Sequence, residues 1–83
     1  MNINFDKVDM KFSPDGTKIY ISVPYSKRFA ELLHLNLTVD DYTHYEWYGE
    51  GQCWKIYTWG EQWVIDRLVT ILEVLYPLPH TTI

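Results

Sequence analysis

The sequence contains a single cysteine, Cys53, and no long hydrophobic run. One cysteine excludes a disulfide within the chain and a cysteine metal cluster, and it fits a reducing compartment. No apolar stretch approaches the roughly 20 residues that a membrane-spanning helix needs. The first residues are charged and alternating, which is unlike a secretion signal. We therefore expect a cytoplasmic protein that does not bind a membrane.

Recognisable catalytic, metal-binding and phosphate-binding motifs are also missing. The three histidines, His34, His44 and His80, lie far apart in the chain. His44 and Glu46 could share one strand face, but a metal site needs further ligands. The glycines do not follow the spacing of a phosphate-binding loop, and no pattern favours a nucleophilic site. The sequence predicts a protein that is not an enzyme and that uses no metal and no cofactor.

Positive charge is absent from the middle third of the chain, while the net charge of the whole is −4. Residues 1–28 contain five basic and three acidic residues, a net charge of +2. Residues 29–54 contain no lysine or arginine and five acidic residues: Glu31, Asp40, Asp41, Glu46 and Glu50. Such a segment attracts basic partners and repels a phosphate backbone.

The chain has 83 residues, which suits one domain over 1–83, and 17% of them are aromatic. A chain this short buries only around 60–65% of the surface its unfolded form exposes, so large rings help to build its core. Residues 44–63 hold all four tryptophans and three tyrosines. These rings form either a hydrophobic core or a binding surface.

Local patterns predict the secondary structure. Alternating hydrophobic residues predict strands over 5–12 and 17–23, joined by a type I turn at "SPDG". Ser26 is expected to cap a helix over 27–35. Aromatic and β-branched residues predict strands over 42–48 and 52–58, joined by "GEG". Thr58 and Glu61 have the spacing of a capping box, which predicts a second helix that continues to about Tyr76 and is ended by Pro77.

These elements predict an α+β fold with the order β-β-α-β-β-α. Its four strands would form an antiparallel sheet with both helices on one face. Strand alternation then sorts the rings between the two faces of the sheet. The side chains expected to point inward are Tyr45, Trp47, Trp54 and Ile56. Those expected to point outward are Tyr42, His44, Glu46, Tyr48, Cys53, Lys55 and Tyr57, with Cys53 half exposed.

The outward residues and the neighbouring acids define the predicted partner-binding surface: Asp40, Asp41, Tyr42, Glu46, Tyr48 and Glu50. Tyrosine supplies contact area at low entropic cost and is enriched at interfaces. Alternatively, these residues form only the solvated face of a sheet. We predict a non-enzymatic protein that docks a basic, nucleic-acid-handling protein, for example a phage or mobile-element inhibitor of the anti-CRISPR kind. Exposed strand edges are also compatible with a homodimer.

A family resemblance suggests another function. The segment "KIYISVPYSKRFAELLHL", followed by an aromatic strand, "CWKIYTW" and a long helix, resembles the HARP-type domain found beside annealing helicases and in small phage or bacterial proteins. Val23-Pro24-Tyr25 matches the strand end and Trp54 the hairpin tryptophan, over about residues 18–76.

The resemblance implies binding of single-stranded or branched DNA, in which aromatic rings stack on bases and cations meet phosphates. The candidate DNA-binding residues are Lys18, Lys27, Arg28, Lys55 and Tyr57. The hairpin region of such domains usually carries arginine or lysine, whereas residues 29–54 contain neither. The charge pattern therefore favours a basic protein partner over DNA.

Overall fold

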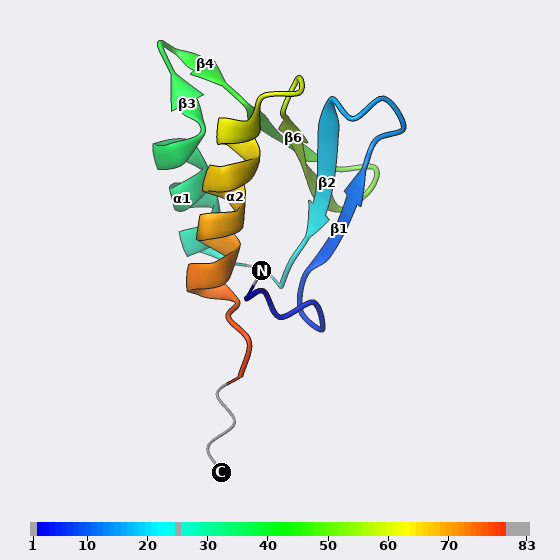
Figure 1. The fold of residues 1–83 in the computed structure, drawn as a ribbon, viewed down its shortest axis with the longest axis vertical. Coiled ribbons are helices and arrows are strands. Elements are labelled where there is room, and N and C mark those ends of the chain that lie inside the picture. The colour runs from blue at the N-terminus through cyan, green and yellow to red at the C-terminus, as the bar shows by residue number, and fades with distance from the viewer. Residues whose placement is uncertain (1, 25, 80–83) are drawn as a thin grey trace.

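A computed structural model of the chain describes residues 2–24 and 26–79. Tyr25 and His80, which the sequence patterns include, lie outside these ranges. The protein has an α+β fold, as predicted (Figure 1). The elements are β1 (Asp9–Phe12), β2 (Lys18–Ser22), α1 (Lys27–Asn36), β3 (Thr38–Val39), β4 (Tyr42–Thr43), β5 (Tyr45–Tyr48), β6 (Cys53–Tyr57) and α2 (Gln62–Leu75).

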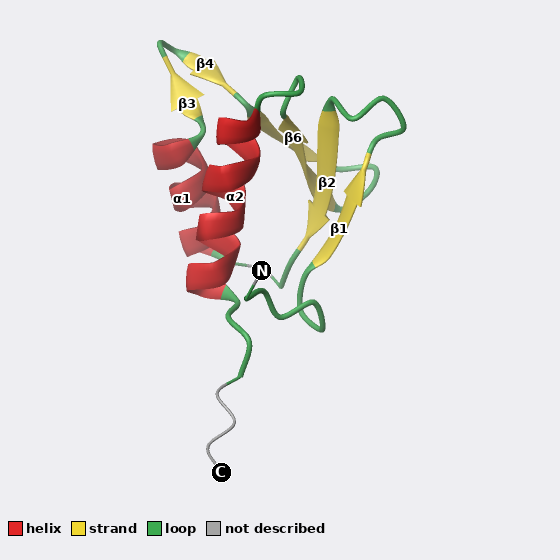
Figure 2. Cartoon of the chain, viewed as in Figure 1, coloured by secondary structure: helices red, strands yellow, loops and turns green. Residues whose placement is uncertain are grey.

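The main sheet is antiparallel and has four strands in the order β1-β2-β6-β5. Both helices lie on one side of this sheet (Figure 2). The other side, which we call the open face, is covered by no helix of the described residues. A feature that was not predicted is the small hairpin of β3 and β4, which arises because the strand expected over 42–48 is divided at His44.

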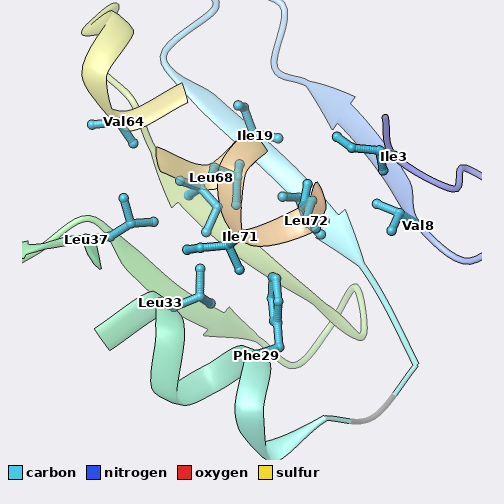
Figure 3. Packing of buried hydrophobic residues seen from close by; sticks show 12 residues of the cluster. Ile3, Val8, Ile19, Phe29, Leu33, Leu37, Val64, Leu68, Ile71 and Leu72 are labelled. Carbon is cyan, nitrogen blue, oxygen red and sulfur yellow. The ribbon is translucent and has the colours of Figure 1, made fainter. Parts of the chain in front are cut away.

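The core fills the space between the sheet and the two helices (Figure 3). Ile19, Ile21 and Ile56 project from the sheet toward apolar side chains of α1 and α2, as the alternation of strand residues predicts. Among the described residues, the buried cluster consists of Ile3, Val8, Ile19, Ile21, Phe29, Leu33, Leu37, Ile56, Val64, Leu68, Ile71 and Leu72.

The two helices begin in different ways. The Ser26 hydroxyl accepts a hydrogen bond from the backbone N–H of Phe29 at 3.1 Å, so the predicted cap of α1 is confirmed. The predicted capping box of α2 is wrong, because its N-cap residue is Glu61 and that side chain makes no capping hydrogen bond. The buried Thr58 hydroxyl instead donates to the carbonyl oxygen of Gly16 at 3.1 Å, which ties the turn before α2 to the β1–β2 turn.

The β1–β2 turn is built around the carboxylate of Asp15. It accepts hydrogen bonds from the hydroxyl of Ser13 at 2.6 Å and from the backbone N–H and hydroxyl of Thr17 at 3.0 and 2.8 Å. Gly16 follows with φ 75°, a left-handed conformation that suits glycine. The bond from Ser13, followed by those from Thr17, holds the pKa of Asp15 well below its usual value of 3.8.

Asp15→Ala is expected to make the stability of the protein less sensitive to acid. The folded-state pKa of Asp15 lies below its unfolded value, so its contribution is present above about pH 4 and is lost as the pH falls through the folded pKa. Urea unfolding at about pH 7 and about pH 2 measures the difference in free energy. Asp9→Ala, an exposed change on β1, is the control. Equal acid sensitivity of wild type and Asp15→Ala would contradict this account.

Candidate protein-binding site

His44 is buried, so the prediction that it belongs to the outward row is wrong. Its N–H donates to the Leu37 carbonyl oxygen and its own carbonyl oxygen accepts from the Tyr57 N–H, each at 2.8 Å. Its Nδ1 lies 3.1 Å from the Tyr57 carbonyl oxygen. This residue joins the β3–β4 hairpin to the main sheet, and strand alternation does not continue through it.

The imidazole of His44 is surrounded by a group of rings that we call the hairpin-end cluster: Tyr42, His44, Tyr57, Trp59 and Trp63. The centroid of His44 lies 5.0 Å from Trp63, 5.2 Å from Trp59 and 5.5 Å from Tyr42, all with edge-to-face geometry. Trp59 is stacked on Tyr57 at 5.6 Å and lies 5.4 Å from Tyr42. Segments that are separate in the sequence thus supply one aromatic surface at this end of the molecule.

Trp59 has an unfavourable backbone conformation. Its φ is 45° and that of Gly60 is 77°, while the N–H of Glu61 closes the turn on the carbonyl oxygen of Thr58 at 2.8 Å. A bulky residue rarely adopts the left-handed region, because its Cβ crowds the backbone. The indole that this turn presents is 45% exposed. Strained backbones cluster at binding and active sites, so Trp59 is a candidate binding residue.

Asp40 and Asp41 form the two-residue tip of the β3–β4 hairpin, which projects beyond the end of α1 (Figure 1). Both are exposed and both have left-handed backbones, with φ 49° and 65°. Two left-handed residues are what a tight hairpin turn requires, and aspartate tolerates that conformation better than most residues. The fold therefore holds two neighbouring carboxylates away from the body of the protein.

A shallow hollow of about 510 Å³, widely open to solvent, lies between this hairpin and the first two turns of α2. Its walls combine rings with carboxylates: Val39, Asp40, Tyr42, His44, Glu61, Trp63 and Arg67. The indole N–H of Trp63 donates to the carboxylate of Glu61. The guanidinium of Arg67 lies 5.0 Å from the ring centre of Trp63 and donates to the carbonyl oxygen of Asn36 at 2.9 Å. We call this hollow the hairpin-end pocket.

The other predicted partner-binding residues lie on or beside the open face. Glu46 accepts a hydrogen bond from the hydroxyl of Tyr57 at 3.1 Å, and its carboxylate is 3.6 Å from the ammonium of Lys55. That ammonium is 4.6 Å from the ring centre of Tyr48, whose hydroxyl donates to Glu50 at 3.4 Å. These contacts connect the open face through Tyr57 and Trp59 to the hairpin-end cluster.

The titration of two open-face residues reflects this packing. Burial, together with the hydrogen bond to Glu46, raises the pKa of the Tyr57 hydroxyl. Burial alone would lower the pKa of Lys55, but the oxygens of Tyr57, Glu46, Tyr20 and Tyr48 outweigh it and raise that pKa. Lys55 is therefore positively charged at neutral pH, and it forms an ion pair with one oxygen, Oε1, of the half-exposed Glu46 carboxylate.

The structure separates the six predicted partner-binding residues into two groups. Asp40, Asp41 and Tyr42 gather at the hairpin end. The others lie on β5 and in the following turn: Glu46, Tyr48 and Glu50. The sequence interpretation did not include Trp59, Trp63 and Glu61 in the site. The sequence feature that could have indicated them is "TWGE", in which tryptophan precedes glycine. These residues form a left-handed turn and not a capping box, and this turn brings the rings beside the hairpin.

Two predictions about burial need correction. Trp47 lies opposite Trp54 on the helix side of the sheet, with ring centres 5.2 Å apart, yet it is 51% exposed because β5 is an edge strand. Cys53, expected to be half exposed, is only 8% exposed. A side chain at Gly51 would meet Tyr48 and the sulfur of Cys53, so the β5–β6 turn folds closely over the thiol.

The candidate DNA-binding residues do not form one basic surface. Lys18 and Tyr57 face each other across β2 and β6, and Lys55 lies beside them on the open face. Lys27 and Arg28 begin α1, on the other side of the sheet. Lys55 is paired with Glu46, and Arg28 lies 3.4 Å from Glu31. The carboxylates thus compensate two of the four cations.

Within residues 2–24 and 26–79, no group of three or more histidine, cysteine or acidic side chains is arranged to hold a metal ion. In the same part of the chain, neither helix has the length and hydrophobicity needed to cross a bilayer. Comparison with known proteins yields no family model, curated protein or solved structure that matches this chain. The resemblance to HARP-type domains stays a prediction.

Proposed function

We propose that this protein is a non-enzymatic binding module that docks a basic protein partner at its hairpin end. The observation that carries this proposal is the hairpin-end pocket, where aromatic rings and the carboxylates of Asp40 and Glu61 line one hollow. A lysine or arginine side chain near the face of a ring gains about 0.5–2 kcal/mol from the ring quadrupole. Carboxylates at the same place add charge complementarity.

Arg67 determines which rings at the hairpin end a basic side chain can reach. Its guanidinium already lies against Trp63, so the pocket contains one internal cation–ring contact. Tyr42, which follows Asp40 and Asp41 in the chain, is 54% exposed, and Trp59, 5.4 Å from Tyr42, is 45% exposed, so both rings remain accessible to a second cation. Basic side chains of a partner are therefore expected to contact these two rings rather than Trp63.

The partner class follows from charge. Proteins that bind phosphate backbones carry clustered lysine and arginine, which an acidic protein can cover. A nucleic-acid-handling protein is therefore the proposed partner, and this protein would act on it as an inhibitor. An anti-CRISPR factor or a similar phage or mobile-element antagonist is a biological setting in which such an activity is useful.

Neutralising the hairpin tip is expected to weaken this interaction. Asp40→Asn with Asp41→Asn removes two charges and keeps residues that accept a left-handed backbone. The partner is first captured from host cells with the wild-type protein, and its Kd is then measured by calorimetry at two salt concentrations. We expect the double variant to bind about tenfold more weakly and with a smaller salt dependence.

The matched control is Asp6→Asn with Asp9→Asn. It makes the same change in net charge at or near β1, the edge strand opposite to β5. Equal binding by the two double variants would contradict the proposed site. A mobility-shift titration with single-stranded and forked DNA completes the test. Salt-sensitive micromolar binding of DNA would replace the protein partner with direct nucleic-acid recognition.

A further inference from the structure

Strand β5 is an edge of the sheet whose outward backbone groups can be identified. It pairs with β6 and with no other strand of the described residues. The bond from the Tyr57 N–H to the His44 carbonyl oxygen sets the alternation of the antiparallel ladder. By this alternation Glu46 and Tyr48 direct their backbone groups toward β6. The N–H and C=O groups of Tyr45 and Trp47 therefore point outward, away from the sheet.

An apolar cavity of about 530 Å³ lies beside this edge, between the sheet and the start of α1. Its apolar walls are Val23, Pro24, Ala30, Trp47 and Trp54, and Lys27 stands among them. The indole of Trp47 contacts Trp54 on one side, and the residue as a whole is 51% exposed. An exposed edge strand beside an apolar cavity has the features that proteins use to add a strand from a partner.

The two sides of β5 differ in chemistry. Glu46 lies on the open face, where Lys55 and Tyr57 both contact its Oε1 atom and its side chain stays 53% exposed, and Trp47 lies on the helix side. We propose that β5 accepts an extended segment of the protein partner by strand addition. In this segment basic residues facing Glu46 alternate with apolar residues that enter the cavity beside Trp47. Lys27 repels basic residues from the cavity, which favours this one orientation of the segment.

This inference deepens the proposed function, since the basic character of the partner is taken from it, but it concerns a separate set of residues. A second copy of the chain fits β5 less well than a basic segment does. Antiparallel pairing of two β5 strands would place no lysine or arginine of the added strand beside Glu46, because β5 consists of Tyr45, Glu46, Trp47 and Tyr48.

The test uses a defined probe, an acetylated and amidated nonapeptide of alternating lysine and valine. A peptide of the same composition with its lysines and valines in blocks is the control. In an NMR titration with the alternating peptide, we expect the signals of the Trp47 indole and of the Tyr45 and Trp47 backbone amides to shift. We expect the alternating peptide to bind at least about tenfold more tightly, because only its side chains match both faces of β5.

Two variants separate the contribution of the Trp47 ring to peptide binding from that of its backbone N–H. Trp47→Ala removes the indole, and Trp47→Pro also removes the outward N–H while leaving the ladder to β6 intact, as edge strands allow. We expect Kd to rise about tenfold with alanine and about tenfold more with proline. Phe12→Ala and Phe12→Pro form the matched control, because Phe12 is 55% exposed and occupies the equivalent outward position on β1. Urea unfolding verifies that each variant folds.

Three results would overturn strand addition at β5: no binding of the alternating peptide at millimolar concentration, shifts confined to Tyr42 and Trp59, or a wild-type dimer that Trp47→Pro dissociates. The third result would assign the edge to a second copy of the chain. Failure of the proposed function looks different. In that case the peptide still binds β5, while Asp40→Asn with Asp41→Asn leaves partner binding unchanged.

Discussion

Replacing Trp59 with glycine is expected to weaken binding of the basic partner by about 30-fold or more while changing stability by less than about 1 kcal/mol. The indole is the most exposed tryptophan side chain of the hairpin-end cluster, and it rests on Tyr57 at a stacking distance of 5.6 Å. Tryptophan is the residue type most often dominant in protein interfaces. Its removal takes away both apolar contact and a ring for a cation.

Stability is expected to be nearly preserved because two effects oppose each other. Loss of the ring contacts costs about 1 kcal/mol, and glycine relieves the left-handed strain at φ 45° by a similar amount. Trp59→Ala separates these effects, since alanine lacks the ring but keeps the Cβ. We expect it to bind the partner as weakly as the glycine variant and to be about 1 kcal/mol less stable than it.

Calorimetric titration with the captured partner and urea unfolding of each variant measure both quantities. A glycine variant that binds normally would remove Trp59 from the proposed interface. An alanine variant as stable as the glycine variant would show that the backbone at this turn is not strained.

Replacing Phe29 with alanine is expected to destabilise the protein by about 3–5 kcal/mol. Phe29 lies on α1, is completely buried and contacts Trp54 and Tyr76, with ring centres 6.2 and 6.3 Å away. It projects from the first turn of α1 toward the other core side chains (Figure 3). An alanine leaves a cavity that these large neighbours cannot fill. The loss is a large part of the stability of about 5–15 kcal/mol that is usual for a domain.

Urea unfolding compares this variant with Phe12→Ala, the same substitution at a residue that is 55% exposed on β1. The Phe12 variant is expected to lose about 1 kcal/mol or less, because much of that side chain is already in water. A loss below about 1 kcal/mol for Phe29→Ala would mean that the core does not depend on this ring.

Local patterns in the sequence predicted the fold class well. The alternation of apolar residues places Ile19, Ile21 and Ile56 on the core side of the sheet, and Ser26 caps α1. Each of these features depends on residues within a few positions of one another, or on the simple rule that one side of a strand faces the core. No knowledge of distant contacts was needed for them.

The same patterns failed where distant segments meet. His44 continued the alternation of a strand, but hydrogen bonds to Leu37 and Tyr57 end β4 there and leave the imidazole buried. Thr58 had the spacing of a capping residue, but its hydroxyl bonds to Gly16, 42 positions earlier. In both places a polar group forms a hydrogen bond with a distant segment, whereas the local pattern predicted that it would bond within its own strand or helix.

By itself the sequence determined the chemistry that the surface can offer: an aromatic-rich chain with no positive charge over residues 29–54. It also determined the α+β class, because periodicity is a property of neighbouring residues. Only the tertiary structure decided where this chemistry is concentrated. The β3–β4 hairpin and the start of α2 bring carboxylates and rings from separate segments to one pocket, and the left-handed turn at Trp59 places a further ring beside Tyr42. The alternation of side chains along a strand shows which residues share a face, but it does not specify which distant segments lie close together in the folded chain.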